Sequence, residues 1–192
     1  WKRLAQLGWP GLSVPAEYGG SGADVMTGAV LCEEIARRFP SLATDWLLVS
    51  MTARVLRESG SAAQKSELLP KLASGEFLMS FGMSEPGGGT DVLALTTRAT
   101  LDGDQWIVKG QKLYTSLADD ADAILVLCRT DPAEGAKRSR GLSLVLTPRR
   151  YLLWLVEMTM LFSGPYRFLK GWAKTLYTLE NREQVKQPRP VT

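Results

Sequence analysis

FLMSFGMSEPGGGTD, residues 77–91, contains the point at which the chain changes from helical to strand-like patterning. Residues 77–84 form a short run rich in β-formers, and a glycine-rich turn follows it directly. Similar runs recur at 93–100, 105–109, 122–130 and 141–147. Asp102-Gly103-Asp104 predicts a hairpin turn between the second and third of them. No helical pattern separates the runs, so a parallel Rossmann sheet is not expected.

The residues before this stretch have a helical period. Apolar side chains recur at three- and four-residue spacings along one face of each of two predicted helices: Leu31, Cys32, Ile35 and Phe39, then Leu42, Trp46, Val49, Ala53 and Leu56. Pro40 is expected to end the first helix and Gly60 the second, and Ser61 is expected to cap a third helix that ends near Gly75. Five glycines between Gly8 and Gly22 predict irregular backbone that needs either a positive φ or a close approach of two segments. Helices at 1–76 followed by strands at 77–149 indicate an α+β fold.

Composition excludes several classes of function. Residues 1–150 contain 17 Lys and Arg against 17 Asp and Glu, so the net charge of +3 comes from residues 151–192. A nucleic-acid protein would instead carry a basic face on its folded part. The chain has no histidine, which excludes Ser-His-Asp and Cys-His catalysis and most zinc and non-haem iron sites. Cys32 and Cys128 have the contexts of small buried hydrophobic residues. An enzyme of this composition needs a cofactor or carboxylates for its reaction.

The glycine-rich turn is the first candidate site. Three consecutive glycines at 87–89 let the backbone approach a planar ligand or a phosphate. The hydroxyls of Ser84 and Thr90 add neutral donors, which suit negative charge developing on a ring. The alternative is a flexible turn of a β domain with no ligand. No Gly-Lys-Ser/Thr follows, so the turn is not a P-loop.

A second candidate lies at residues 106–116, WIVKGQKLYTS. Tyr114 and Ser116 are two residues apart, which puts them on the same face of an extended strand. Tyr114 would then lie against a ring face while Ser116 hydrogen-bonds the ring edge. The alternative is that Tyr114 is a cross-strand aromatic in the core of a β domain.

The two candidates in this order resemble the acyl-CoA dehydrogenase family. Its TEPxxGSD loop is matched by residues 84–91, its NGxKxWITN segment by 109–116, and its AD and RT pairs by Ala121-Asp122 and Arg129-Thr130. Residues 7–11 and 15–20 are similar to the family's LGWxGLxxPEEYGG stretch, and Glu33-Glu34 and Leu69-Pro70 also match. The resemblance covers residues 1–149.

The resemblance implies a helical N-terminal domain, an antiparallel β-barrel middle domain and FAD bound between that barrel and a C-terminal helical bundle. The expected cofactor-binding residues are Phe81, Met83, Ser84, Tyr114, Thr115 and Ser116. By position, Ser84 would hydrogen-bond the pyrimidine edge of the flavin, Tyr114 would cover the isoalloxazine, and the Ser116 hydroxyl would lie near N5. Thr90 would contact the acyl-CoA. A Leu at 117 replaces the family's usual Asn.

The implied reaction removes two hydrogens from the α and β carbons of an acyl-CoA thioester. A glutamate takes the α proton, the β hydrogen leaves as hydride to FAD, and the electrons pass to electron-transfer flavoprotein. The implied setting is fatty acid metabolism, in the cytoplasm or the mitochondrial matrix, by a homo-oligomer. The family's glutamate base falls beyond this chain, so no catalytic residue is assigned and the isolated chain is expected to be an inactive fragment.

Residues 150–192 do not match the family and are predicted to be a tail of different origin. Their apolar run, Tyr151 to Phe162, is too short for a membrane span. Because the chain starts at Trp1, its N-terminal end is expected to be truncated. Two alternatives stay open: a related flavin monooxygenase or oxidase on the same scaffold, and a non-catalytic interaction module. Acyl chain length and branching are not predicted.

Overall fold

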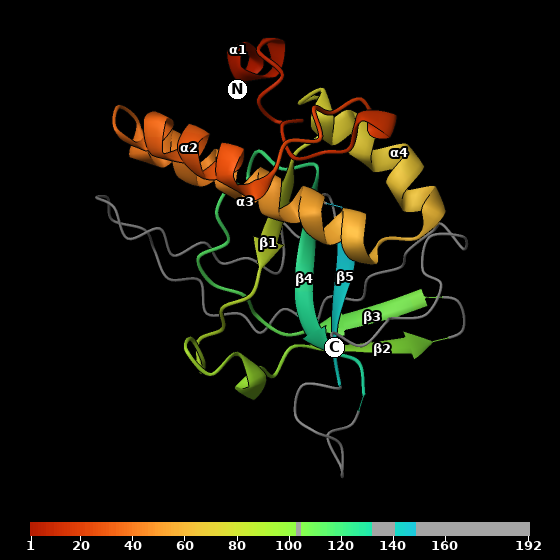
Figure 1. The fold of residues 1–192 in the computed structure, drawn as a ribbon. Coiled ribbons are helices and arrows are strands. Elements are labelled where there is room, and N and C mark those ends of the chain that lie inside the picture. The colour runs from red at the N-terminus through yellow and green to blue at the C-terminus, as the bar shows by residue number, and fades with distance from the viewer. Residues whose placement is uncertain (103–104, 132–140, 149–192) are drawn as a thin grey trace. The chain divides into compact units, whose positions relative to one another are not determined.

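The computed structural model describes residues 1–102, 105–131 and 141–148 (Figure 1). The chain divides into two compact units. The helical unit consists of Trp1–Phe81 with Ser116–Ile124, and the strand unit consists of Gly82–Thr115 with the chain from Leu125 onward. The predicted tail at 150–192 lies outside the described residues.

The helical unit contains four α-helices and a short 3-10 helix. They are α1 (Lys2–Gln6), η1 (Ala16–Tyr18), α2 (Val25–Ala36), α3 (Pro40–Ser59) and α4 (Ala62–Ala73). α2 and α3 run side by side (Figure 1). Pro40 occupies the first turn of α3, where its missing N–H costs nothing, and α2 ends before it at Ala36. The prediction of helices before residue 76 is confirmed.

Ser61 caps α4 as predicted. Its hydroxyl accepts a hydrogen bond from the backbone N–H of Gln64, and the Gln64 side chain accepts one from the N–H of Ser61. This reciprocal pair satisfies two of the N–H groups that a helix start leaves without a partner. The sequence Ser-x-x-Gln therefore determines where α4 begins.

The core of the helical unit follows the predicted apolar stripe of α3. Trp46, Val49, Ala53 and Leu56 are buried. The Trp46 indole also donates to the carbonyl oxygen of Trp9 at 2.9 Å, which ties the N-terminal loop to α3. Phe39 was expected on the apolar face of the preceding helix, and that prediction is wrong. Phe39 is the N-cap residue of α3, outside both helices, and is 65% exposed.

The glycines of the N-terminal loop meet the two predicted demands, a positive φ and a close approach of two backbone segments. Gly19 has a φ of +81°, a conformation that favours glycine. At Gly20 an added Cβ would lie 2.0 Å from the carbonyl oxygen of Val14, so only glycine allows the two backbone segments to approach. The loop is therefore an ordered part of the helical unit.

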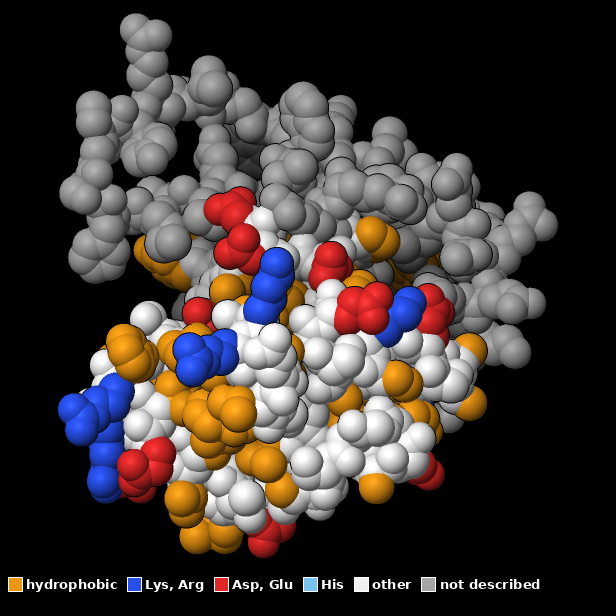
Figure 2. Space-filling view, turned by 90° about the horizontal axis from the view of Figure 1, so that it is seen from above, with side chains coloured by type: hydrophobic (Ala, Val, Ile, Leu, Met, Phe, Trp, Pro, Cys, Tyr) orange, Lys and Arg blue, Asp and Glu red, His pale blue; other side chains and the backbone are white. Residues whose placement is uncertain are grey.

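Apolar side chains are exposed on the helical face shown in Figure 2. The large exposed apolar residues of this unit are Leu7, Val25, Met26, Val30, Phe39, Leu47 and Met51. Within the described part of the chain, none of the helices has both the length and the apolar character needed to traverse a bilayer.

Among the residues that the structure describes, the strands form one five-stranded sheet. They are β1 (Met79–Gly82), β2 (Arg98–Asp102), β3 (Gln105–Lys109), β4 (Ala123–Arg129) and β5 (Leu142–Pro148), and a 3-10 helix, η2 (Val92–Ala94), precedes β2. The order along the sheet is β1-β4-β2-β3, with β5 paired to β4. β4 is buried along its whole length, and Leu95, Leu127 and Leu142 pack together in the core.

The sheet is mixed, which corrects the expectation of a purely antiparallel one. β2 and β3 pair antiparallel with Asp102 opposite Gln105, as the predicted hairpin requires. β2 and β4, however, pair parallel, with Arg98 opposite Arg129. A parallel neighbour requires a long connection, and the irregular chain between β3 and β4 supplies it. The α+β fold class is confirmed.

The predicted strand at 93–100 is only partly present. η2 covers Val92–Ala94, and β2 begins at Arg98. The backbone N–H groups of Thr96 and Thr97 donate to the carboxylate of Glu85, at 2.6 and 2.9 Å. Because a side chain takes these donors, they are not available to a strand ladder. The ladder therefore starts one residue later.

Candidate functional site

The glycine-rich segment begins with a tight turn after β1. Glu85 and Gly88 exchange two backbone hydrogen bonds, of 3.2 and 3.1 Å, around Pro86 and Gly87. Gly87 and Gly89 have no positive φ, and a Cβ added to either meets nothing within 4 Å. Neither the backbone conformation nor the packing of the described residues requires glycine at these two positions.

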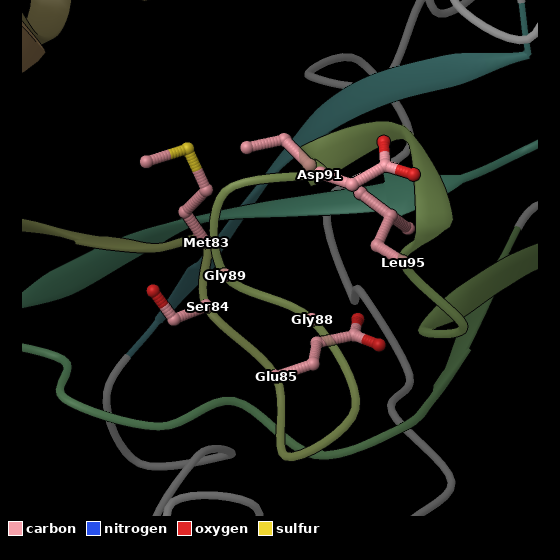
Figure 3. Close-up of a pocket in the computed structure, with 8 residues that line it drawn as sticks. Met83, Ser84, Glu85, Gly88, Gly89, Asp91 and Leu95 are labelled. Carbon is pink, nitrogen blue, oxygen red and sulfur yellow. The ribbon is translucent and has the colours of Figure 1, made fainter.

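A small pocket lies at this turn (Figure 3), lined by residues that include Met83, Ser84 and Leu95. It has room for about one water molecule and cannot hold a ring system. Figure 3 also shows that the side chains of Ser84 and Glu85 leave the backbone on opposite sides. Ser84 is half-buried, whereas Glu85 is buried.

The second predicted segment is an extended strand only as far as Lys109, so the expectation of an extended strand around Tyr114 and Ser116 is wrong. β3 ends at Lys109, and residues 111–115 form no regular structure. Tyr114 has a φ of +55° and Leu117 a φ of +60°. An L-residue in the left-handed region breaks the alternation of side chains along an extended chain, so the same-face argument for Tyr114 and Ser116 does not apply. Tyr114 is 69% exposed, which also rules out the core-aromatic alternative.

The two predicted segments meet within the strand unit. The backbone N–H of Leu113 donates to the carbonyl oxygen of Ser84 at 2.8 Å. The residues on either side of this hydrogen bond, Met83 and Tyr114, both expose large side chains. Thr115, the next residue, has a buried hydroxyl that finds no hydrogen-bond partner among the described residues. Thr90 is exposed in the same glycine-rich segment.

Two further predicted residues lie in the helical unit. Phe81 is half-buried in β1, and Ser116 is exposed. The hydroxyl of Ser80, next to Phe81, donates to the carbonyl oxygen of Ser116. The structure therefore brings Met83, Ser84, Tyr114 and Thr115 together in one unit, and Phe81 and Ser116 together in the other.

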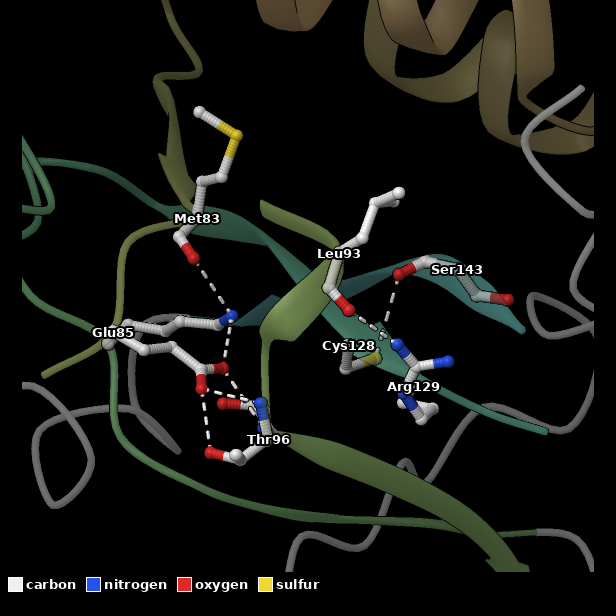
Figure 4. Close-up of polar contacts among 9 residues, drawn as sticks. Met83, Glu85, Leu93, Thr96, Cys128, Arg129 and Ser143 are labelled. Atoms are coloured by element: carbon white, nitrogen blue, oxygen red, sulfur yellow. Dashed lines mark hydrogen bonds and ion pairs between the residues drawn. The ribbon is translucent and has the colours of Figure 1, made fainter. Parts of the chain in front are cut away.

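A buried ion pair joins Glu85 of the glycine-rich segment to Lys112 of the second predicted segment, and Figure 4 shows the contacts of Glu85. Lys112 Nζ lies 2.8 Å from Glu85 Oε1, and the side chains are only 2% and 4% exposed. Lys112 Nζ also donates to the carbonyl oxygen of Met83 at 3.1 Å. Glu85 Oε2 accepts from the N–H and the hydroxyl of Thr96, and Oε1 accepts from the N–H of Thr97.

The Glu85 carboxyl group of this pair has a pKa far below neutral. Burial by itself would raise the pKa of Glu85, but the hydrogen bonds from Lys112, Thr97 and Thr96 outweigh it and lower the pKa to about 2. Burial lowers the pKa of Lys112, and the nearby Glu85 carboxylate opposes that shift. An ammonium group with two oxygen acceptors, one of them a carboxylate, fits the observed geometry.

The sequence patterns predicted no role for Glu85, Lys112 or Arg129. The guanidinium of Arg129 donates to the carbonyl oxygen of Leu93 at 2.9 Å and so attaches η2 to the end of β4. In the sequence, Arg129 is a charged residue at the end of an otherwise apolar run, and this feature could have drawn attention to it. Neighbouring Cys128 is buried, which raises the pKa of its thiol to about 12 and leaves it unreactive.

The residues around the Ser84–Leu113 hydrogen bond fit a planar, largely uncharged ring system. Met83 and Tyr114 offer exposed apolar surface, the Ser84 and Thr115 hydroxyls are hydrogen-bonding groups, and the backbone at Gly87 and Gly89 is bare. Within the described ranges, no group of three or more Cys, Asp or Glu side chains is arranged to hold a metal ion.

Comparison with known proteins identifies the family of the chain. Residues 1–76 match the model of the acyl-CoA dehydrogenase N-terminal domain, and residues 80–152 match that of the acyl-CoA dehydrogenase middle domain. Acyl-CoA dehydrogenase FadE26 of Mycobacterium tuberculosis is 39% identical over 147 residues, which cover 76% of this chain and 36% of the relative.

Two solved structures are similar to the chain. An acyl-CoA dehydrogenase from Geobacillus kaustophilus is 34% identical with a TM-score of 0.72, over 78% of this chain and 39% of that one. A glutaryl-CoA dehydrogenase from Mycobacterium smegmatis, solved in complex with FADH2, is 28% identical with a TM-score of 0.69, over 77% of this chain and 36% of that one. The chain thus spans less than two-fifths of the length of each of these relatives.

Proposed function

The chain belongs to the acyl-CoA dehydrogenase family, and we propose that it forms the FAD-binding and acyl-CoA-binding front part of such an enzyme. The reaction is the removal of two hydrogens from the α and β carbons of an acyl-CoA thioester. FAD, when bound, supplies the hydride acceptor. The observation that carries the proposal is the hydrogen bond from Leu113 to Ser84, which joins the glycine-rich segment to the segment with the exposed Tyr114.

Each predicted residue has a role that its chemistry allows. Tyr114 and Met83 cover the apolar ring, and the Ser84 hydroxyl hydrogen-bonds its polar edge. Thr115 adds a further hydroxyl to this set. Phe81 and Ser116, which belong to the helical unit, keep the cofactor-binding role that the family resemblance implies. Thr90 contacts the acyl-CoA. Met83 and Tyr114 support this assignment because both are large apolar side chains exposed to solvent.

Gly87 and Gly89, which contact nothing that would exclude a side chain, support the same proposal. Nothing in the described chain requires glycine at 87 or 89, and glycine there raises the entropy lost on folding. A ligand that lies against the backbone would require it. We therefore expect Gly89→Ala to leave folding stability unchanged or slightly higher, and to weaken FAD binding.

FAD titration of the purified chain, followed by flavin fluorescence and absorbance, tests the proposal. We expect quenching or a red shift of the flavin spectrum, and a weaker effect in Tyr114→Ala. Phe39→Ala is the matched control, because Phe39 is an equally exposed aromatic in the helical unit. A flat titration of the wild-type chain would contradict the proposal and favour a non-catalytic interaction module. Equal losses in Tyr114→Ala and Phe39→Ala would contradict the assignment of Tyr114.

The remaining assignments extend the same proposal. The domains are a helical N-terminal domain at 1–76 and a β-barrel middle domain at 77–149; the family-model matches to residues 1–76 and 80–152 support this division. Electron-transfer flavoprotein accepts the electrons, the complete protein is a homo-oligomer, and it works in the cytoplasm or the mitochondrial matrix. The 192 residues alone are expected not to turn over acyl-CoA, because none of them matches the family's glutamate base. Turnover by the purified chain would contradict this.

A further inference from the structure

The Glu85 carboxylate joins the two ends of the glycine-rich segment by hydrogen bonds. It accepts hydrogen bonds from the N–H and the hydroxyl of Thr96, at 2.6 and 2.7 Å, and from the N–H of Thr97 at 2.9 Å. The segment 86–95, which includes Thr90, therefore follows Glu85 in the chain and is held against the side chain of Glu85 at its other end. Figure 4 shows these contacts converging on Glu85.

Lys112 connects the Glu85 carboxylate to the segment that carries Tyr114. Its ammonium group donates to Glu85 Oε1 at 2.8 Å and to the carbonyl oxygen of Met83 at 3.1 Å. The next residue, Leu113, hydrogen-bonds the carbonyl oxygen of Ser84. Two consecutive residues of one segment thus hold two consecutive carbonyl groups of the other.

Stability alone does not account for a buried ion pair. Removing two charges from water is costly, and apolar residues of similar volume often stabilise a core equally well. Charged hydrogen bonds, in contrast to apolar contacts, have direction and fix one relative placement of the groups they join. Here they fix the Met83 carbonyl against Lys112 and the ends of the 86–95 segment against Glu85.

We propose that Glu85 and Lys112 are positioning residues. They hold the segment that carries Tyr114 and the segment 86–95, which carries Thr90, in one fixed arrangement. The proposal rests on the proposed function, because it assumes that FAD lies against Met83, Ser84 and Tyr114. Neither side chain touches the cofactor. Each acts through the backbone: Lys112 through Met83, and Glu85 through Thr96 and Thr97.

Variants of the pair separate positioning from folding. Lys112→Met leaves the Glu85 carboxylate buried without its cation and is expected to destabilise the chain. The double variant Glu85→Gln/Lys112→Met has no uncompensated charge, and Gln still accepts hydrogen bonds from Thr96. It is expected to recover part of the lost stability. It still lacks the donor to the Met83 carbonyl, so FAD affinity should stay at least about tenfold below wild type.

The readouts are the dissociation constant of FAD, the visible absorption and circular dichroism of the bound flavin, and the urea unfolding midpoint. Lys112→Arg, which keeps a cationic donor, should restore both affinity and spectrum in part. Arg54→Met/Glu58→Gln is the matched control, because this exposed pair has the same 2.8 Å separation and should change no readout.

The outcomes distinguish this inference from the proposed function. If wild type binds FAD and the folded double variant binds it with equal affinity and an identical spectrum, the positioning role is wrong and the proposed function stands. If affinity rises and falls only with the unfolding midpoint across all variants, the pair is merely structural. If the wild-type titration is flat, the proposed function fails and the inference fails with it.

Discussion

The helical unit and the strand unit contain ion pairs of equal length in opposite environments. In α3, Arg54 and Glu58 lie 2.8 Å apart with more than half of each side chain exposed. In the strand unit, Glu85 and Lys112 lie 2.8 Å apart with almost no exposure. Water screens the first pair, so it contributes little, whereas the second is shielded and strongly coupled to its surroundings.

The difference shows how each unit is held together. Apolar stripes at helical spacing form the core of the helical unit, and its charges stay outside. The strand unit places a charged network within its core, and this network is hydrogen-bonded to the backbone of the candidate residue Met83. A core of the first kind tolerates changes of surface charge. One of the second kind depends on every member of the network.

Removal of the Lys112 charge is expected to have the largest effect on the free energy of unfolding. Lys112→Met should lower the free energy of unfolding by about 3 to 5 kcal/mol, because it leaves Glu85 as an uncompensated buried charge. Urea denaturation followed by circular dichroism measures this. Arg54→Met is the control and should leave the midpoint unchanged. Equal effects of the two substitutions would remove the contrast between the units.

Truncation of an apolar core residue tests the helical unit. Leu69 in α4 is completely buried, and Leu69→Ala should cost about 3 kcal/mol through lost burial and the cavity it leaves. Leu47→Ala, at a substantially exposed position on α3, should cost far less. Hydrogen exchange measured on peptides of each unit should show the loss of protection in α4. Loss confined to β2 and β3 would contradict the assignment.

Acid should weaken the strand unit through Glu85. Its pKa is about 2 in the folded protein and 4.5 ordinarily, so the unfolded chain binds this proton more readily. The stabilisation is complete above pH 4.5 and is lost as the pH falls toward 2, up to about 3 kcal/mol. The stability difference between wild type and Glu85→Gln should therefore shrink over this range. A difference that stays constant from pH 6 to pH 2.5 would contradict the lowered pKa.

The smallest effect concerns the capping box of α4. Ser61→Ala removes the acceptor for the Gln64 N–H and should cost about 1 kcal/mol. Ser59→Ala, at an exposed position two residues earlier, should have no such cost. Thermal unfolding followed by circular dichroism compares the two. Equal melting temperatures would mean that the capping box is not needed at this helix start.

Local patterns predicted the elements well and the site in part. Ser61, Gly20 and the Asp102–Gln105 hairpin follow from short-range rules of capping, close approach and turn geometry, and each is found as predicted. The glycine-rich and tyrosine-containing segments were chosen as candidates from the sequence, and the structure joins them by the hydrogen bond from Leu113 to Ser84. The extended conformation expected around Tyr114 was wrong, because residue periodicity does not reveal a residue with positive φ.

What the sequence determined by itself is the order of helices and strands, the ends of the helices, and the two motifs that identify the family. These depend on interactions between residues close in the chain. The tertiary structure alone decided that β2 runs parallel to β4, and that Glu85 and Lys112 are buried against each other. A charged side chain has the same pattern in the sequence whether it faces water or a core, and only contacts between distant segments determine which of the two occurs.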